Sequence, residues 1–293
     1  MDTANLQTFI AVAKLESFSL AAEQLYLTQP AISKRIAALE SELDARLFDR
    51  IGRRVTLTEA GRALLPRAQT LLRDIEDSRR LISNLTGHAG GKLSIGTSHH
   101  IGLHRLPPVL RRYTASYPDV ELDLHFMDSE QACRAVHSGD LELGIVTLPL
   151  EPIPELESEI IWPDPLNIVV GIDHPLAKLT AVKLAQLADY PAILPAKGTY
   201  TREVLEHSFA PLGIALKVGM TTNYLETIKM LVSVGLGLSW SVLPRTMLSN
   251  ELVALTVSGI ELQRQLGMVW HASRTLSNAA RVMMETLRAE AQS

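Results

Sequence analysis

Side chains that can hydrogen-bond to bases and phosphates gather between residues 28 and 54. In the segment TQPAISKR, a glutamine amide can bridge an adenine edge, and a lysine or arginine cation can bind a guanine edge. Further along, the segment RIGRR holds three arginines, which suit phosphates or a narrow minor groove. We therefore predict contacts with double-stranded DNA from Thr28, Gln29, Pro30, Ala31, Ser33, Lys34, Arg35, Arg50, Arg53 and Arg54.

Three short helices and a hairpin are expected to position these groups. Apolar residues recur at helical spacing from residue 4 to 15, then around Ala21 and Ala22, and then from Ile32 to Leu43. Thr28 is placed to cap the third helix, and Pro30 is tolerated in its first turn. In a helix-turn-helix, the first turns of the second helix meet base edges. We expect Gln29, Ala31, Ser33 and Lys34 to face the groove and Arg35 to meet phosphate, with residues 46–58 forming a strand–turn–strand wing.

The overall charge of the chain is not that of a polycation. The net charge is −4, and residues 1–60 hold seven basic and eight acidic side chains. Five of the seven basic residues are Lys34, Arg35 and the arginines in or beside the turn of the wing, Arg50, Arg53 and Arg54, so the positive charge is local. We expect moderate affinity per copy, a dependence on dimerisation, and clear weakening by salt.

A heptad seam follows the wing. Apolar and small residues step by four and three from Leu64 to Leu85 on an otherwise polar helix that Thr58 would cap. The seam could pack on its own chain, but it outlasts the N-terminal domain, which favours a helix dimer.

From residue 92 the pattern alternates strands and helices, as in an α/β domain with a largely parallel sheet. Late strands are expected at 167–172 and 267–272. In such units ligands gather at the carboxyl ends of strands, beside helix N-termini. Hydroxyls, helix N–H groups and an arginine there suit a small anion, although the hydroxyls could equally be helix caps. The candidate ligand-binding residues are Thr97, Ser98, His99, His100, Ile101, Ser129, Thr147, Tyr200, Thr201, Arg202 and Asn223.

We expect neither a metal site nor a cofactor. His99 and His100 are adjacent and point in different directions on regular backbone, so a hydrogen-bonding or pH-sensitive role is favoured. Cys133 is the only cysteine, which excludes a disulfide within the chain and a cysteine-cluster metal site.

The N-terminal segment resembles the signature of LysR-type transcriptional regulators. The matching residues are Phe9, Ser17, Phe18, Ala21, Ala22, Leu25, Thr28, Gln29, Pro30, Ala31, Ile32, Ser33, Ile36, Leu39, Glu40, Leu43, Leu47, Phe48, Arg50, Arg53, Thr58 and Gly61. One departure is Asp44, where the family usually has glycine. Aspartate tolerates a positive φ better than most residues, so the fold is expected to survive it.

The resemblance implies α/β plus α architecture: an N-terminal winged helix-turn-helix (1–58), a long linker helix (59–88), and an effector-binding domain (92–293) similar to periplasmic binding proteins. Subdomain one would comprise 92–162 and 267–293, and subdomain two 163–266. It also implies an antiparallel linker-helix dimer, often within a tetramer.

The predicted function is a sequence-specific regulator of promoter DNA that responds to a small anionic metabolite held between the subdomains. The alternatives are an α/β enzyme or a solute-binding protein with an accessory DNA module. No G-x-S-x-G elbow, P-loop or dinucleotide fingerprint supports the enzyme. With no signal-peptide pattern and no apolar stretch long enough for a bilayer, we expect a cytoplasmic protein that does not bind membranes.

Overall fold

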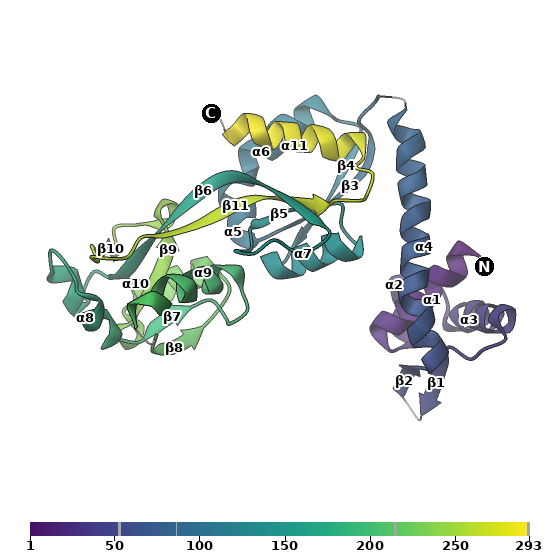
Figure 1. Cartoon of the computed structure of the whole chain (residues 1–293), viewed down its shortest axis with the longest axis horizontal. Coiled ribbons are helices and arrows are strands. Elements are labelled where there is room, and N and C mark those ends of the chain that lie inside the picture. Colours follow the sequence, from purple (N-terminus) through teal and green to yellow (C-terminus); the bar gives the residue numbers. More distant parts are fainter. Residues whose placement is uncertain (52–53, 86, 214–215, 292–293) are drawn as a thin grey trace. The chain divides into compact units, whose positions relative to one another are not determined.

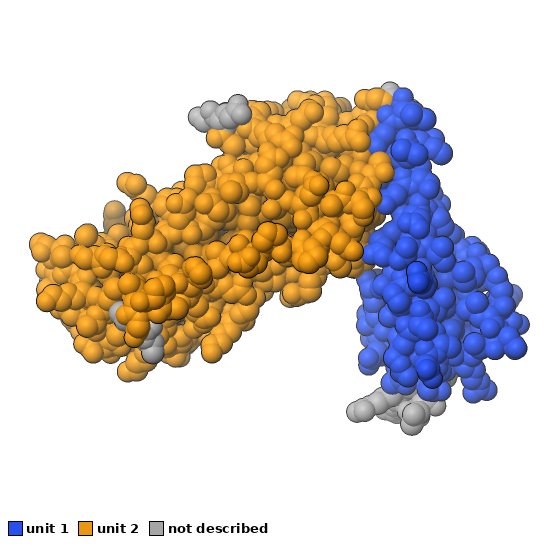
Figure 2. All heavy atoms as spheres, viewed as in Figure 1, with its two compact units in different colours: residues 1–86 blue, residues 87–293 orange. Residues whose placement is uncertain are grey.

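Residues 1–86 and 87–293 form separate units in the computed structural model (Figure 2). The structure describes residues 1–51, 54–85, 87–213 and 216–291, and at positions 50, 51 and 54 it describes the backbone only.

The first unit contains four helices and a two-stranded hairpin among its described residues (Figure 1). Side chains at Asp2, Ser17 and Thr58 accept hydrogen bonds from backbone N–H groups and so begin three of the helices. In the hairpin, Phe48 pairs with Leu57 and Arg50 with Val55 in antiparallel register. The bounds are α1 Thr3–Leu15, α2 Phe18–Gln24, α3 Gln29–Leu43, β1 Phe48–Ile51, β2 Arg54–Leu57 and α4 Glu59–Asn84.

The core of this unit fixes the direction of α3. Ile32, Ile36 and Leu39 are buried on one face of that helix, so the opposite face is left to the surface. At the end of α3, Asp44 has a φ of +47°, as anticipated for the position where the family usually has glycine. The Glu40 carboxylate then accepts from the backbone N–H of Leu47 at 2.7 Å and fastens the loop that leads into the hairpin.

The second unit is built on one nine-stranded sheet among its described residues, in the order β4-β3-β5-β11-β6-β9-β7-β8, with β10 paired to β6. Strands β3, β4 and β5 are parallel, as are β7, β8 and β9, whereas β11 and β6 run antiparallel to their neighbours. The bounds are β3 Gly91–Thr97, β4 Val120–Phe126, β5 Leu143–Thr147, β6 Leu156–Gly171, β7 Ala192–Leu194, β8 Val218–Thr221, β9 Trp240–Pro244, β10 Leu252–Ala254 and β11 Leu262–His271.

Two long strands join the two ends of this sheet (Figure 1). The sequence predicted strands at 167–172 and 267–272, but β6 begins at Leu156 and β11 at Leu262, so both predictions were too short. In β6, Pro163 and Pro165 lack the N–H that a strand interior normally uses, so the first part of this strand did not read as one. Both prolines nevertheless pair with β11.

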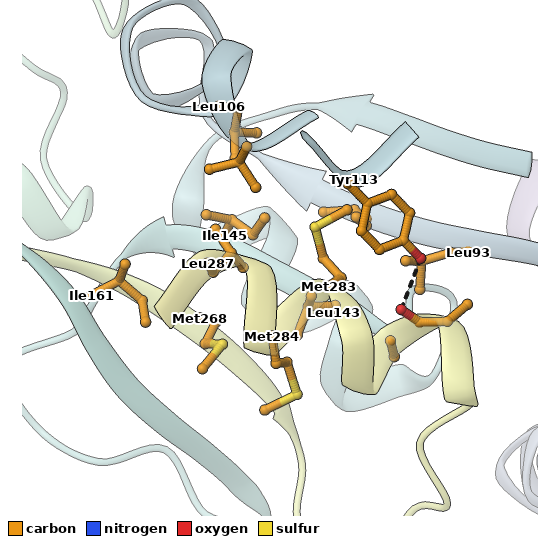
Figure 3. Packing of buried hydrophobic residues seen from close by; sticks show 14 of the residues in the cluster. Leu93, Leu106, Tyr113, Leu143, Ile145, Ile161, Met268, Met283, Met284 and Leu287 are labelled. Atoms are coloured by element: carbon orange, nitrogen blue, oxygen red, sulfur yellow. Dashed lines mark hydrogen bonds between the residues drawn. The ribbon is translucent and has the colours of Figure 1, made fainter. Parts of the chain in front are cut away.

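Helices cover the sheet in two groups. We call β3–β5 with α5–α7 and α11 the first half, and β7–β9 with α8–α10 the second half. In the first half, α6 and α11 close a core in which the Tyr113 hydroxyl donates to the backbone oxygen of Ala279 at 2.9 Å (Figure 3). The bounds are α5 His99–His104, α6 Leu106–Ser116, α7 Ser129–Ser138, α8 Leu184–Ala188, α9 Tyr200–Phe209, α10 Leu225–Ser233 and α11 Asn278–Ala291, with 3-10 turns at Pro175–Lys178, Ala210–Leu212, Leu236–Leu238 and Arg245–Met247.

Candidate nucleic-acid interface and ligand site

The start of α3 presents polar groups that the helix itself does not use. Thr28 occupies the N-cap position, but its hydroxyl makes no capping bond, contrary to the expectation from its type. Thr28, Gln29, Pro30 and Lys34 are exposed, and Ala31 and Ser33 are half-buried. The Gln29 amide donates to the Ser33 hydroxyl at 3.0 Å, which orders the first turn. The predicted groove-facing residues are therefore accessible, fully or in part, in the first two turns of α3.

Arg35 lies on a different side of the same helix. It is half-buried, and its Nη1 is 3.4 Å from the hydroxyl of Thr8 in α1. Its phosphate contact stays a prediction.

The arginines of the wing cannot be placed in the same way. Arg53 lies outside the described residues, and so do the side chains of Arg50 and Arg54. The backbone around them forms the predicted hairpin, since β1 and β2 pair up to Ile51 and Arg54.

In the second unit, a cavity of about 50 Å³ collects most of the predicted ligand residues. It lies where the carboxyl ends of β3 and β5 and the start of α7 meet the start of α9 and α10. The predicted residues that line it are Ser98, His99, His100, Ser129, Thr147, Thr201 and Asn223. Further lining residues, which the sequence did not single out as binding residues, are Asp128, Glu130, Pro195, Thr199, Leu225 and Arg264.

Several of these hydroxyls are also helix caps, as the simpler reading of the sequence held. Ser98 accepts from the Ile101 N–H at 3.4 Å, and Thr199 accepts from the Arg202 N–H at 3.3 Å. Ser129 accepts from the backbone N–H of Thr147 at 3.0 Å, which ties α7 to the end of β5. The cavity wall is therefore held by the same bonds that begin its helices.

Four predicted residues do not line this cavity. Thr97 is fully buried in β3, and Ile101 belongs to the core of the first half. The Tyr200 ring packs against the cluster that holds Cys133. Arg202 is 3% exposed, and its guanidinium is taken by Glu206 at 2.8 Å and by the backbone oxygen of Pro195 at 3.4 Å. Its positive charge is therefore neutralised within the second half.

Arg264 on β11 supplies the cavity's guanidinium instead. Its Nε donates to Asp164 Oδ2 at 2.8 Å and its Nη1 to the Thr201 hydroxyl at 2.9 Å. Arg105 also donates to Asp164, at 3.3 Å, so two cations share one carboxylate that is 1% exposed. Burial lowers the pKa of Arg264, and Asp164 opposes that shift.

Buried polar atoms without a partner cluster at this wall. Both ring nitrogens of His100 and the Nη2 of Arg264 have no hydrogen-bond partner among the described residues. Burial, with Arg264 nearby, lowers the pKa of His100 to about 3, so its ring is neutral at physiological pH. Such orphaned groups are rare in folded proteins and call for an explanation.

Polar contacts cross the cavity between the two halves. Asn223 donates to Asp128 Oδ2 at 2.7 Å, and the Tyr200 N–H donates to the Glu130 carboxylate. His104 in α5 pairs with Glu226 in α10 at 2.7 Å. Burial raises the pKa of Glu130, whereas its bond from Tyr200 lowers it. These contacts join the two halves of the second unit.

Two further tests concern metals and membranes. Among residues 1–51, 54–85, 87–213 and 216–291, no group of three or more His, Cys, Asp or Glu side chains could hold a metal ion. No helix in the described part of the chain has the length and apolar character needed to cross a bilayer.

Both units match known protein families. Residues 3–62 match "Bacterial regulatory helix-turn-helix protein, lysR family", and residues 86–292 match "LysR substrate binding domain". The chain therefore belongs to the LysR family of transcriptional regulators. It is a DNA-binding regulator with an effector-binding domain, and it is not an enzyme.

Individual relatives agree with this assignment. The RuBisCO operon transcriptional regulator of Allochromatium vinosum is 31% identical over 289 residues, which cover 98% of this chain and 95% of that protein. An uncharacterized HTH-type transcriptional regulator in the ibpB-leuC intergenic region of Azotobacter vinelandii is 66% identical over 108 residues, 37% of this chain and 75% of the relative.

Solved structures share the fold. Full-length CbnR in complex with its target DNA has a TM-score of 0.66 at 22% identity, covering 99% of this chain and all of CbnR. Full-length OxyR from Pseudomonas aeruginosa, solved as a single-residue variant, has a TM-score of 0.68 at 22% identity, with 98% of both chains covered.

Proposed function

We propose that this regulator binds promoter DNA as a homo-oligomer and that a small carboxylate-bearing metabolite in the Arg264 cavity alters that binding. The observation that carries the ligand proposal is the set of buried, unpartnered groups at one wall, namely Arg264 Nη2 and the His100 ring nitrogens. A ligand carboxylate would accept from Arg264 Nη2 and from the one ring nitrogen of neutral His100 that carries a proton, and the other ring nitrogen needs a donor.

Electrostatics favour an anion at that wall. Two guanidiniums, Arg264 and Arg105, share the carboxylate of Asp164 there, while the carboxylates of Asp128 and Glu130, which also line the cavity, already accept from Asn223 and from the Tyr200 N–H. The cavity also touches the first residues of α7 and the N-cap of α9, both ten residues long, and helix N-termini stabilise negative charge. A carboxylate suits the planar fork of an arginine.

The size of the cavity supports a coupling to movement. A volume of about 50 Å³ is well below the roughly 300–1,000 Å³ of small-molecule sites, so a metabolite of several atoms needs a wider cavity. Widening it separates the halves and breaks contacts such as Asn223–Asp128 and His104–Glu226. A ligand with different affinity for the two forms then shifts their balance.

The linker helix supports an oligomer. Leu64 and Ala68 pack on the core of the first unit, but Ile82 and Leu85 further along the seam are 66% and 82% exposed, and Leu81 beside the seam is 59% exposed. We assign this part of α4 to a second copy of the chain. We place the domain boundaries at 1–58, 59–88 and 92–293 and divide the last domain within β6 and β11. Because its partner is promoter DNA, we place the protein in the cytoplasm.

Genomic DNA provides the first test. Purified protein is mixed with fragmented DNA, and the recovered fragments are sequenced. We expect a few strongly enriched promoter sites with a pseudo-palindrome, loss of that enrichment in the double variant Lys34→Ala, Arg53→Ala, and its retention in Ser41→Ala at the exposed far end of α3. Uniform, salt-sensitive recovery from the unaltered protein would contradict sequence-specific regulation.

The ligand is tested separately. A panel of small carboxylates is screened by thermal shift and by footprinting on an enriched site. Arg264→Lys keeps the charge but loses the fork, so we expect it to fold and to lose the response. An unchanged response in Arg264→Lys would rule out this wall as the carboxylate site.

A further inference from the structure

A second cavity lies beside the first, on the strand that carries Arg264. Its volume is about 420 Å³, which falls in the range of small-molecule sites. Gln263 and Gln265 line it but not the Arg264 cavity, and Arg264 lines both. Since neighbouring residues of a strand point to opposite faces, the two cavities lie on either side of β11.

The wall of this second cavity is mainly aliphatic. The connection from β5 to β6 supplies leucine, proline and isoleucine, and α9 adds Val204. Val204, Leu148 and Val269 are buried, whereas Ile160 and Leu150 are 58% and 48% exposed and lie at the rim. An apolar surface of this kind gains free energy when a ligand removes it from water.

One polar atom in the wall has no partner. The side-chain oxygen of Gln265 is buried and accepts no hydrogen bond within the described part of the chain, although the backbone oxygen of the same residue is bonded to Leu148 N at 2.8 Å. A buried acceptor without a donor destabilises the folded protein, because its hydrogen bonds to water are lost and not replaced. The oxygen has almost no accessible surface, so a ligand hydroxyl or N–H group reaches it only when the Gln265 amide turns toward the cavity.

We propose that this cavity is a second ligand site for a small, uncharged, mostly apolar molecule with one hydrogen-bond donor directed at Gln265. The space is sufficient for a substituted benzene ring, since an apolar cavity of about 150 Å³ already binds benzene. The ligand class is opposite to that of the Arg264 cavity, which is small and lined by charged groups. The proposal depends only on this second cavity and not on the anion proposed for the Arg264 cavity.

The test uses two probes with the same tert-butylphenyl body, one with a hydroxyl donor and one in which a methyl group replaces the hydroxyl hydrogen. 4-tert-Butylphenol carries a hydroxyl, and 4-tert-butylanisole has the same body with the hydroxyl methylated. Binding to the full chain is measured by calorimetry. We expect one equivalent of the phenol to bind, about threefold to tenfold more tightly than the anisole, which is the range for one neutral hydrogen bond.

Two variants locate the binding. Gln265→Met keeps the length of the side chain and removes the acceptor, so the phenol should fall to the affinity of the anisole. Ile160→Trp fills the exposed rim and should abolish binding of both probes, while Ile160→Ala should leave binding in place. Equal affinities of phenol and anisole for the unaltered protein, or unchanged binding in Ile160→Trp, would overturn the proposal. Because calorimetry needs no DNA, this result is independent of the regulatory test above.

Discussion

The predicted DNA-binding face of α3 and the cavity at Arg264 differ in how their polar side chains are used. On α3, Gln29 and Lys34 are exposed, and the Thr28 hydroxyl is not spent on a cap. At the cavity, Arg264, Asp164 and Ser129 are buried and bonded to one another or to backbone groups. A change on α3 should therefore alter function alone, whereas a change at the cavity should alter stability as well.

The strongest case is Asp164→Asn. It removes the carboxylate that Arg264 and Arg105 share, so the buried Arg264 and the half-buried Arg105 then lack a counter-charge. Breaking a buried ion pair costs about 3–5 kcal/mol, so we expect the free energy of unfolding to fall by that amount in urea titrations. Asp173→Asn, at an exposed acid, is the control and should change little. A loss below about 1 kcal/mol in Asp164→Asn would mean that the ion pairs of Asp164 with Arg264 and Arg105 do not hold the two halves together.

The α3 face should behave in the opposite way. We expect Gln29→Ala and Lys34→Ala each to weaken binding to an enriched promoter fragment by about 1–3 kcal/mol, with no change in the urea midpoint. Ser41→Ala lies on the same helix and should bind normally.

Salt distinguishes the two kinds of contact on α3. If Lys34 meets a phosphate, its removal lowers the slope of log affinity against log salt by about one; if it meets a base, sequence preference relaxes instead. A loss of stability in either variant would remove the contrast with the cavity.

A third prediction concerns pH. The pKa of His100 is lowered to about 3 by burial and by Arg264. Below a pH of about 6.5 this ring is therefore protonated in the unfolded chain but stays neutral in the folded protein. The unfolded state then holds more protons, and stability falls as pH drops from about 6.5 toward 3. Between pH 7.5 and 5.5 this group should contribute a loss of about 1 kcal/mol.

Urea titrations at the two pH values check this. In His100→Leu the pH dependence should flatten by that amount, with His174→Leu, a buried histidine bonded to the backbone oxygen of Leu238, as the comparison. An equal pH dependence in His100→Leu and the unaltered protein would mean that His100 is solvated in the native state.

The two regions also differ in what the sequence could predict. The helix-turn-helix follows from local signals. The spacing of apolar residues predicted which face of α3 is buried, and Asp44 was recognised as a position that takes positive φ. At the cavity, hydroxyls at helix starts such as Ser98 and Ser129 were identified for the same local reason. These features depend on neighbours in sequence.

Arg264 was missed because its role depends on distant residues. A strand beginning at 262 would have placed it among Leu262, Leu266 and Met268, a charge on an apolar face, but the expected strand began at 267. Arg202 was chosen instead for its place at a helix start, although Glu206 four residues on was available to neutralise it. The partners Asp164 and Arg105 come from other elements, and no spacing rule brings them to Arg264.

The smallest effect should come from the contact that crosses the cavity at its exposed edge. His104 and Glu226 are 34% and 47% exposed, and pairs of this kind contribute about 0–1 kcal/mol. Glu226→Gln should therefore leave the urea midpoint nearly unchanged, in contrast with Asp164→Asn. Because the pair joins the two halves, its loss should still favour the wider cavity and raise the affinity for a carboxylate found in the thermal-shift screen by a few-fold, measured by calorimetry. A large loss of stability in Glu226→Gln would show that the edge, rather than the buried Asp164, holds the halves together.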